Sequence, residues 1–156
     1  MSSADKNLSE FSSPLPNGSG FKIGIVWAEW NENITSSLLK GVLKVLEMAG
    51  VNSSNIMTRY VPGTFELPLA AQKLAKKTEI DGVICLGCVI QGETKHFDFI
   101  SQAAANGIME VGLKYNKPVI FGVLTTNTMQ QAEDRAGGKH GNKGEEAAYS
   151  LLKMLG

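Results

Sequence analysis

Short, mostly apolar runs alternate with amphipathic stretches along the chain, and this alternation predicts the secondary structure. Each run has the length and the composition of a strand. The predicted strands are residues 22–27, 55–61, 83–90 and 118–124. Between and after them, apolar residues recur at the spacing of one helix face. The predicted helices are residues 34–50, 65–77, 97–115, 129–135 and 144–155.

The order of these elements predicts the fold class. Apolar strands that alternate with helices form a parallel sheet with helices on both faces, because the crossover connections are right-handed. We therefore predict an α/β fold, a three-layer α/β/α sandwich with a four-stranded parallel sheet, flavodoxin-like in outline. Pro68 falls in the first turn of its predicted helix, where a missing N–H costs least.

Residues 1–20 differ in composition from the rest of the chain. They are rich in Ser, Asn, Gly and Pro, a composition that is too polar to pack and predicts a flexible N-terminal arm. The folded domain is then expected over residues 21–156. With 156 residues, 43% of them hydrophobic, the chain has the size of one domain with one core.

The charge and the cysteine content of the chain argue against several kinds of partner and site. The 15 basic and 15 acidic residues cancel, so neither nucleic acid nor a membrane is expected as a partner. No apolar run approaches the roughly 20 residues that span a bilayer, and no export signal is recognisable, so a cytoplasmic location is expected. Cys85 and Cys88 point to opposite faces of a predicted strand, which indicates buried structural thiols rather than a metal or redox site.

Polar and aromatic residues follow every predicted strand. The carboxyl ends of parallel strands meet at one edge of a sheet, where open α/β sheets bind their ligands. Aromatic, amide, carboxylate and hydroxyl groups at this edge indicate a pocket for a planar heterocycle that carries a polyol. The segments are residues 28–32, 62–66, 91–96 and 125–127.

Several residues here can either carry chemistry or serve the structure. His96 is the candidate for proton transfer, because the pKa of a histidine lies near neutral pH and the residue falls between a strand end and a helix start. Its alternative role is to cap that helix, which Thr94 can also do. Trp30 and Phe65 are either core residues or aromatic platforms at the pocket rim, and Phe121 is most simply a core residue of its strand.

A glycine-rich loop with cations follows residue 135. Arg135, Lys139 and Lys143 lie in or beside residues 136–144, whose glycines leave backbone N–H groups accessible. Such a cluster suits a phosphate, which arginine binds through two parallel hydrogen bonds, but a plain basic turn has the same composition. The loop is not a Walker A motif, since no GxxxxGK[ST] occurs, and no dinucleotide fingerprint follows a strand.

Three stretches together resemble a known family. Residues 61–68 (VPGTFELP), 86–98 (LGCVIQGETKHFD), and 135–139 (RAGGK) with 141–144 (GNKG) are similar, in order and spacing, to the signature stretches of the 6,7-dimethyl-8-ribityllumazine synthase family. The match runs from about Phe21 to the C-terminus. It implies a transferase of riboflavin biosynthesis that condenses 5-amino-6-(D-ribitylamino)uracil with 3,4-dihydroxy-2-butanone 4-phosphate, releasing phosphate and water.

The resemblance also implies roles for individual residues. Trp30 and Phe65 would frame the ring and the ribityl chain, and Glu66 would accept hydrogen bonds from ribityl hydroxyls. Backbone groups of Val89 and Ile90 would bind the pyrimidine edge. The implied substrate-binding residues are Trp30, Asn31, Gly63, Thr64, Phe65, Glu66, Cys88, Val89, Ile90, Gly92, Glu93, Thr94, Phe121, Arg135 and Lys143.

The phosphate and the proton relay complete the implied site. Backbone or hydroxyl donors in residues 92–94 would bind the phosphate, and His96 would be the catalytic proton relay. The family places Phe121, Arg135 and Lys143 in the site from the adjacent subunit. The implied protein is therefore a homo-oligomer built from pentamers, either a pentamer or an icosahedral capsid, with two small-molecule substrates and no cofactor.

Trp30 departs from the family pattern, because many members have phenylalanine at this position. The variable side chains of Glu93 and Lys95 receive no role. Two rival functions come from other classes of protein. A non-catalytic flavin-binding or shell-forming protein would not need the cations at Arg135 and Lys143. A flavodoxin-like electron carrier would need a phosphate loop where residues 28–32 are acidic and lack glycine.

Overall fold

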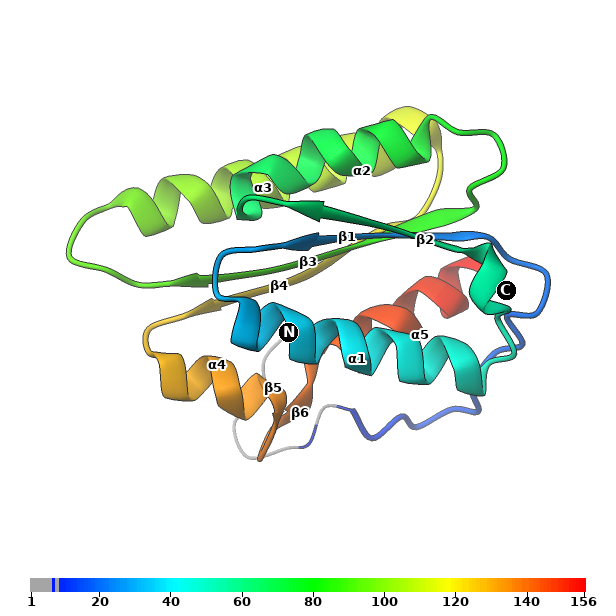
Figure 1. Cartoon of the computed structure of the whole chain (residues 1–156), viewed down its shortest axis with the longest axis horizontal. Coiled ribbons are helices and arrows are strands. Elements are labelled where there is room, and N and C mark those ends of the chain that lie inside the picture. Colours follow the sequence, from blue (N-terminus) through cyan, green and yellow to red (C-terminus); the bar gives the residue numbers. More distant parts are fainter. Residues whose placement is uncertain (1–6, 8) are drawn as a thin grey trace.

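The computed structural model describes residue 7 and residues 9–156, which form three layers around one parallel sheet (Figure 1). The strands are β1 (Ile23–Ala28), β2 (Ile56–Val61), β3 (Gly82–Ile90) and β4 (Val119–Thr126), and their order in the sheet is β2-β1-β3-β4. The α-helices are α1 (Glu32–Met48), α2 (Leu67–Ala75), α3 (His96–Tyr115), α4 (Met129–Arg135) and α5 (Lys143–Leu155), and the short 3-10 helices are η1 (Ser53–Asn55) and η2 (Thr64–Glu66).

Helices cover both faces of the sheet. Helices α2 and α3 lie on one face, whereas α1, α4 and α5 lie on the other (Figure 1). All three strand pairs of this sheet are parallel, so the chain crosses over between successive strands through a helix. The predicted three-layer α/β/α fold with a four-stranded parallel sheet is therefore confirmed.

The alternation of side chains along the central strands produces two cores. Ile23 and Ile25 of β1 pack with α1 and α5, whereas Val26 packs with α2 and α3. In β3, Cys88 belongs to the first core and Cys85 to the second. Both thiols are buried, as predicted, and they lie on opposite faces of the sheet.

Two elements differ from the sequence prediction. The loop expected at residues 136–144 forms a small antiparallel hairpin, β5 (Ala136–Gly138) and β6 (Gly141–Asn142). The helix expected from Phe65 begins at Leu67, because η2 precedes it, and Pro68 still falls in its first turn. Most other element ends agree with the prediction within two residues, the usual uncertainty of a helix end.

The described part of the N-terminal segment lies against the domain. Phe11 stacks on Tyr149 of α5 with ring centroids 4.1 Å apart, and both Phe11 and Leu15 pack against the core between α1 and α5. The Gly18 N–H donates to the Ala49 carbonyl at 2.8 Å. The packing contacts come from Phe11 and Leu15, two apolar side chains that the polar average of residues 1–20 conceals, and the Gly18 bond joins backbone groups. Residues 1–6 and 8 of the predicted arm lie outside the described residues, and the domain boundary at residue 21 stays a prediction.

None of the helices in residue 7 and residues 9–156 is both long and apolar enough to span a membrane.

Candidate functional site

A pocket of about 580 Å³ opens at the carboxyl ends of the strands. Its volume suits a small ligand. It is bordered by the β1–α1 loop, by η2, by the end of β3 and by the start of α3. The lining residues are Trp30, Asn31, Gly63, Thr64, Phe65, Glu66, Cys88, Val89, Ile90, His96 and Ile100.

Two aromatic side chains stand at the rim of this pocket. Trp30 is 74% exposed and Phe65 is 57% exposed, although both are large apolar groups. The Trp30 N–H donates to the Pro62 carbonyl at 3.0 Å, which ties the β1–α1 loop to the end of β2. Since neither ring is buried in a core, the rim interpretation of Trp30 and Phe65 is favoured over the core interpretation.

Helix η2 approaches β3 closely and thereby places Phe65 and Glu66. A Cβ added at Gly87 would lie 2.7 Å from the Thr64 hydroxyl, so only glycine permits this approach. The Thr64 side chain is buried there. Glu66 is exposed and its carboxylate lies over Gly63, where an added Cβ would be 3.1 Å from Oε2. The carboxylate therefore lies at the pocket and is open to a ligand.

The end of β3 forms the floor of the pocket. The pairing of β1 with β3 ends at Leu86, whereas β3 continues to Ile90 and pairs with β4 as far as Thr126. On the β1 side, the backbone beyond Leu86 therefore borders the pocket. The Asn31 side-chain amide donates to the Cys88 carbonyl at 3.0 Å across this edge.

His96 is the first residue of α3 and lines the pocket. Its backbone N–H donates to the Thr94 hydroxyl at 3.3 Å, so Thr94 supplies a local bond at the start of the helix. The His96 imidazole is exposed at the pocket, as a proton-transfer group must be. Ile100 also lines the pocket but was not predicted, although its spacing of one helical turn from His96 places both on one face of α3.

Not every predicted site residue lines this pocket within one chain. Residues 92–94 form an exposed loop after β3, and Phe121 is half-buried in β4, where it packs with the α2–α3 core as its strand position predicts. Arg135 and Lys143 lie at the end of α4 and the start of α5. The structure therefore contains a pocket group and a cation group of predicted site residues, while residues 92–94 and Phe121 belong to neither within one chain.

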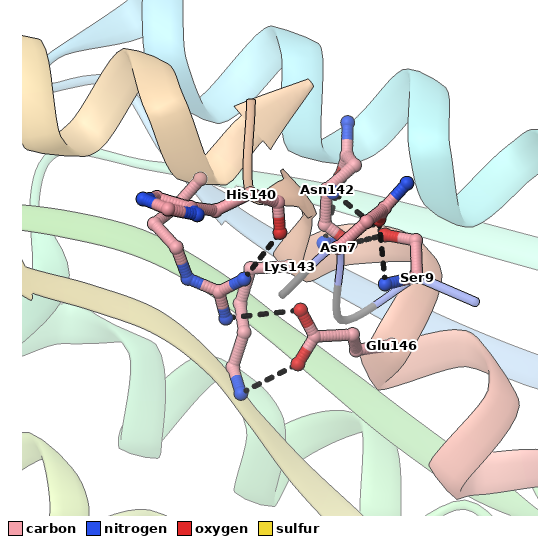
Figure 2. Close-up of polar contacts among 8 residues, drawn as sticks. Asn7, Ser9, His140, Asn142, Lys143 and Glu146 are labelled. Carbon is pink, nitrogen blue, oxygen red and sulfur yellow. Dashed lines mark hydrogen bonds and ion pairs between the residues drawn. The ribbon is translucent and has the colours of Figure 1, made fainter. Parts of the chain in front are cut away.

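The cation group is a partly buried cluster around one carboxylate. Arg135 donates to the His140 carbonyl at 2.9 Å and forms an ion pair with Glu146, also at 2.9 Å. Figure 2 shows that Lys143 pairs with the other oxygen of Glu146, and this distance is 3.3 Å. Two cations thus face one carboxylate, and the excess positive charge suits an anion.

The hairpin that carries these cations is held by Asn142. Its side chain accepts from the Gly144 N–H at 2.8 Å and donates to the Ser37 carbonyl of α1 at 3.0 Å. Its backbone N–H donates to the Ser9 hydroxyl at 2.7 Å, and that hydroxyl donates to the Asn142 carbonyl at 3.2 Å (Figure 2). The start of α5, and Lys143 with it, is therefore fixed relative to α1 and the N-terminal segment.

Neither cysteine is suited to nucleophilic chemistry. Burial raises the pKa of the Cys85 thiol to about 12 and the pKa of the Cys88 thiol to about 11. Both groups are therefore neutral near physiological pH. Among the described residues, no group of three or more His, Cys, Asp or Glu side chains could hold a metal ion.

The fold and the pocket define a class, the α/β proteins that bind a small molecule at the carboxyl ends of parallel strands. Comparison with known proteins narrows this class, because the sequence model of 6,7-dimethyl-8-ribityllumazine synthase matches residues 20–156. The chain belongs to the 6,7-dimethyl-8-ribityllumazine synthase family.

Similar proteins extend over almost the whole chain. The 6,7-dimethyl-8-ribityllumazine synthase of Cytophaga hutchinsonii is 64% identical over 99% of this chain and 98% of its own. The Parabacteroides distasonis enzyme of the same name is 52% identical, with the same coverage. That of Thermus thermophilus is 43% identical over 92% of this chain and 91% of its own.

These findings confirm the family resemblance and the predicted enzyme class, a transferase of riboflavin biosynthesis. The non-catalytic alternative is not favoured. The family also supports small-molecule substrates and oligomeric assembly in general.

Proposed function

We propose that this chain condenses 5-amino-6-(D-ribitylamino)uracil with 3,4-dihydroxy-2-butanone 4-phosphate to 6,7-dimethyl-8-ribityllumazine, releasing phosphate and water. The observation that carries this proposal is the pocket in which Trp30, Phe65, Glu66 and His96 meet at the carboxyl ends of the strands. Relatives named for this activity are similar over nearly the whole chain.

The uracil substrate would occupy the pocket. Its ring would stack on the exposed Trp30 or Phe65, and its polar edge would bind the backbone of Val89 and Ile90. The ribityl hydroxyls would donate to the Glu66 carboxylate, which the structure leaves exposed. An aromatic platform with a few polar groups is the usual composition of such a site.

His96 would transfer protons during the reaction. The uracil amine attacks the ketone and water is lost as the imine forms; phosphate then leaves, and ring closure releases a further water. A positioned acid or base contributes about 10²- to 10⁴-fold to the rate of such steps. The orientation of two substrates in one pocket would supply a further part of the acceleration.

The phosphate would be bound by Arg135 and Lys143 of the adjacent subunit, together with residues 92–94. Within one chain these two cations do not line the pocket. To bind the phosphate there, Arg135 and Lys143 would have to come from another chain. We therefore propose a homo-oligomer in which each site combines the pocket of one subunit with Phe121 and the cation group of its neighbour. A pentamer is the expected unit, and an icosahedral capsid of pentamers is the preferred assembly.

Mixing the purified protein with both substrates tests the activity. Formation of the lumazine chromophore is the expected result. An intact oligomer that binds riboflavin but forms no lumazine would favour the non-catalytic flavin-binding alternative. The native mass, measured on the same sample, is expected to be a multiple of five chains, and a monomer with full activity would refute the shared site. A cytoplasmic location stays a prediction, which cell fractionation tests.

Co-expression of two inactive variants tests the shared site directly. His96→Ala damages the pocket half and Arg135→Ala damages the cation half, so mixed oligomers should contain about a quarter of intact sites when subunits assort at random around a ring. Arg135→Ala with Lys143→Ala is the matched control, because both changes damage the same half and no site regains it. Failure of the first pair to recover activity would contradict the proposal.

A further inference from the structure

The β1–α1 loop contains a residue with an unusual backbone. Asn31 has φ 61° and ψ 48°, in the left-handed region. Among the described residues, Asn116 is the other non-glycine residue with positive φ, and it ends α3, where this conformation is common. Asn31 instead begins α1, a position that normally has extended backbone. The sequence places an asparagine here, one of the few side chains that tolerate this conformation.

The Asn31 side chain does not cap its own helix. Thr128 and Asn142 occupy the equivalent positions before α4 and α5, and their side chains accept from backbone N–H groups of those helices. The Asn31 side chain makes no such bond. Its Nδ2 donates instead to the Cys88 carbonyl of β3 at 3.0 Å, across 57 positions of sequence. A usual capping interaction is thus replaced by a bond to the pocket floor.

This bond lies where the sheet no longer connects the two segments. Since the pairing of β1 with β3 ends at Leu86, the Asn31 amide continues the connection beyond the strand pairs. The adjacent residue, Trp30, is anchored on its other side by the bond from its N–H to the Pro62 carbonyl at 3.0 Å. The 74% exposed indole is therefore carried by a loop with one anchor just after β2, at Pro62, and one on β3, at Cys88.

We propose that Asn31 is a positioning residue for the aromatic platform. Its left-handed backbone turns the loop so that Trp30 stands at the rim, and its amide fixes the distance from that platform to the backbone of residues 88–90. The inference rests on the proposed function, because it takes this pocket as the site of the uracil ring. Asn31 then acts on the binding of the uracil substrate and not on that of the phosphate substrate.

Three substitutions of Asn31 distinguish the effect of its left-handed backbone from the effect of its side-chain amide. Asn31→Gly keeps the left-handed conformation and removes the donor, so the KM for the uracil substrate should rise about 2- to 10-fold, as for the loss of one hydrogen bond. Asn31→Asp keeps the shape but places an acceptor against the Cys88 carbonyl, so its increase should be larger. Asn31→Ala also loses the favoured conformation and should have the lowest melting temperature. The KM for the phosphate substrate should change less than 2-fold in Asn31→Gly.

Asn116→Gly is the matched control, since it replaces the other left-handed asparagine, which lies away from the pocket, and it should leave both KM values unchanged. An unchanged uracil KM in both Asn31→Gly and Asn31→Asp would overturn the inference. So would an equal rise in both KM values, which indicates a merely structural role.

Riboflavin binding keeps the two proposals distinguishable. If the parent chain forms no lumazine, the proposed function fails, but the dissociation constant for riboflavin still tests Asn31 through fluorescence quenching. Weaker binding by 2- to 10-fold in Asn31→Gly would then support the positioning role. An unchanged dissociation constant would overturn it.

Discussion

Replacement of Arg135 by alanine tests the function of the cation group. The change removes a guanidinium that donates to the His140 carbonyl and pairs with Glu146, each at 2.9 Å. It leaves Lys143 at 3.3 Å from the same carboxylate, so Glu146 retains one cation. The perturbation therefore acts both on phosphate binding and on the stability of the hairpin, which different measurements report.

The two effects appear in different quantities, the KM for the phosphate substrate and the free energy of unfolding. A hydrogen bond to a charged group contributes about 1.5–3 kcal/mol, so loss of one phosphate contact should raise the KM for the phosphate substrate about 10- to 150-fold. The free energy of unfolding should also fall, by about 1.5–3 kcal/mol, because the variant loses the bond to the His140 carbonyl and the ion pair with Glu146, whose side chain is only 16% exposed and keeps only Lys143. The KM for the uracil substrate should stay within about 3-fold of the parent value, since Arg135 does not line the pocket of its own chain.

Steady-state kinetics, with each substrate varied in turn at saturating levels of the other, measures this difference. Arg135→Lys is the control, because it keeps the charge but not the planar fork, and an intermediate KM is expected. Equal increases for both substrates, together with a lower midpoint of urea unfolding, would refute a specific phosphate contact and leave Arg135 as a structural residue.

Three further predictions concern stability and stacking. Gly144→Ala should lower the free energy of unfolding, measured in urea, by about 3 kcal/mol or more, because its Cβ would overlap a backbone carbonyl of α1. Gly20→Ala is the control, since the space around Gly20 is open and the free energy of unfolding should change little. Burial raises the pKa of Cys85 from the ordinary 9.0 to about 12 and that of Cys88 to about 11, so thiolates form first in the unfolded chain. The free energy of unfolding should therefore fall as the pH rises above 9.0. Rapid alkylation of the native chain at pH 8 would contradict this burial. Trp30→Phe should abolish most of the quenching of tryptophan fluorescence by riboflavin while binding weakens only slightly, and equal quenching in both proteins would assign Trp30 no stacking role.

The sheet could be predicted from the sequence because its signals are local. The runs in β1 and β3 are apolar enough to be recognised without their neighbours, and the helices between them fix a parallel topology. The hairpin β5–β6 could not be predicted in this way. It depends on Asn142, whose contacts with Ser37 and Ser9 join segments that lie far apart in the sequence.

Much of the pocket group could also be predicted, since the rule for open α/β sheets identifies the residues that follow each strand. Cys88, Val89 and Ile90 lie inside β3 and were expected only from the family resemblance. Composition alone did not decide whether Trp30 lies in the core or at the rim, and the structure favours the rim through its exposure. The bond from Asn31 to Cys88 had no sequence signal, because an asparagine before a helix normally indicates a cap. The separation of Arg135 from the pocket likewise depends on tertiary structure, and the expectation that it serves a neighbouring chain came from the family resemblance.

Each half of the proposed site is tied to its own chain by an asparagine side chain. The pocket half is built on the ends of β1 and β3, where Asn31 links the loop to the sheet. The cation half is built on the start of α5, where Asn142 links the hairpin to α1. Because each half is fixed within its own chain, the distance between the pocket and the cations would be set by the subunit contact alone. Substitutions at that contact should then alter the KM for the phosphate substrate while the structure of the pocket and of the cation group stays unchanged.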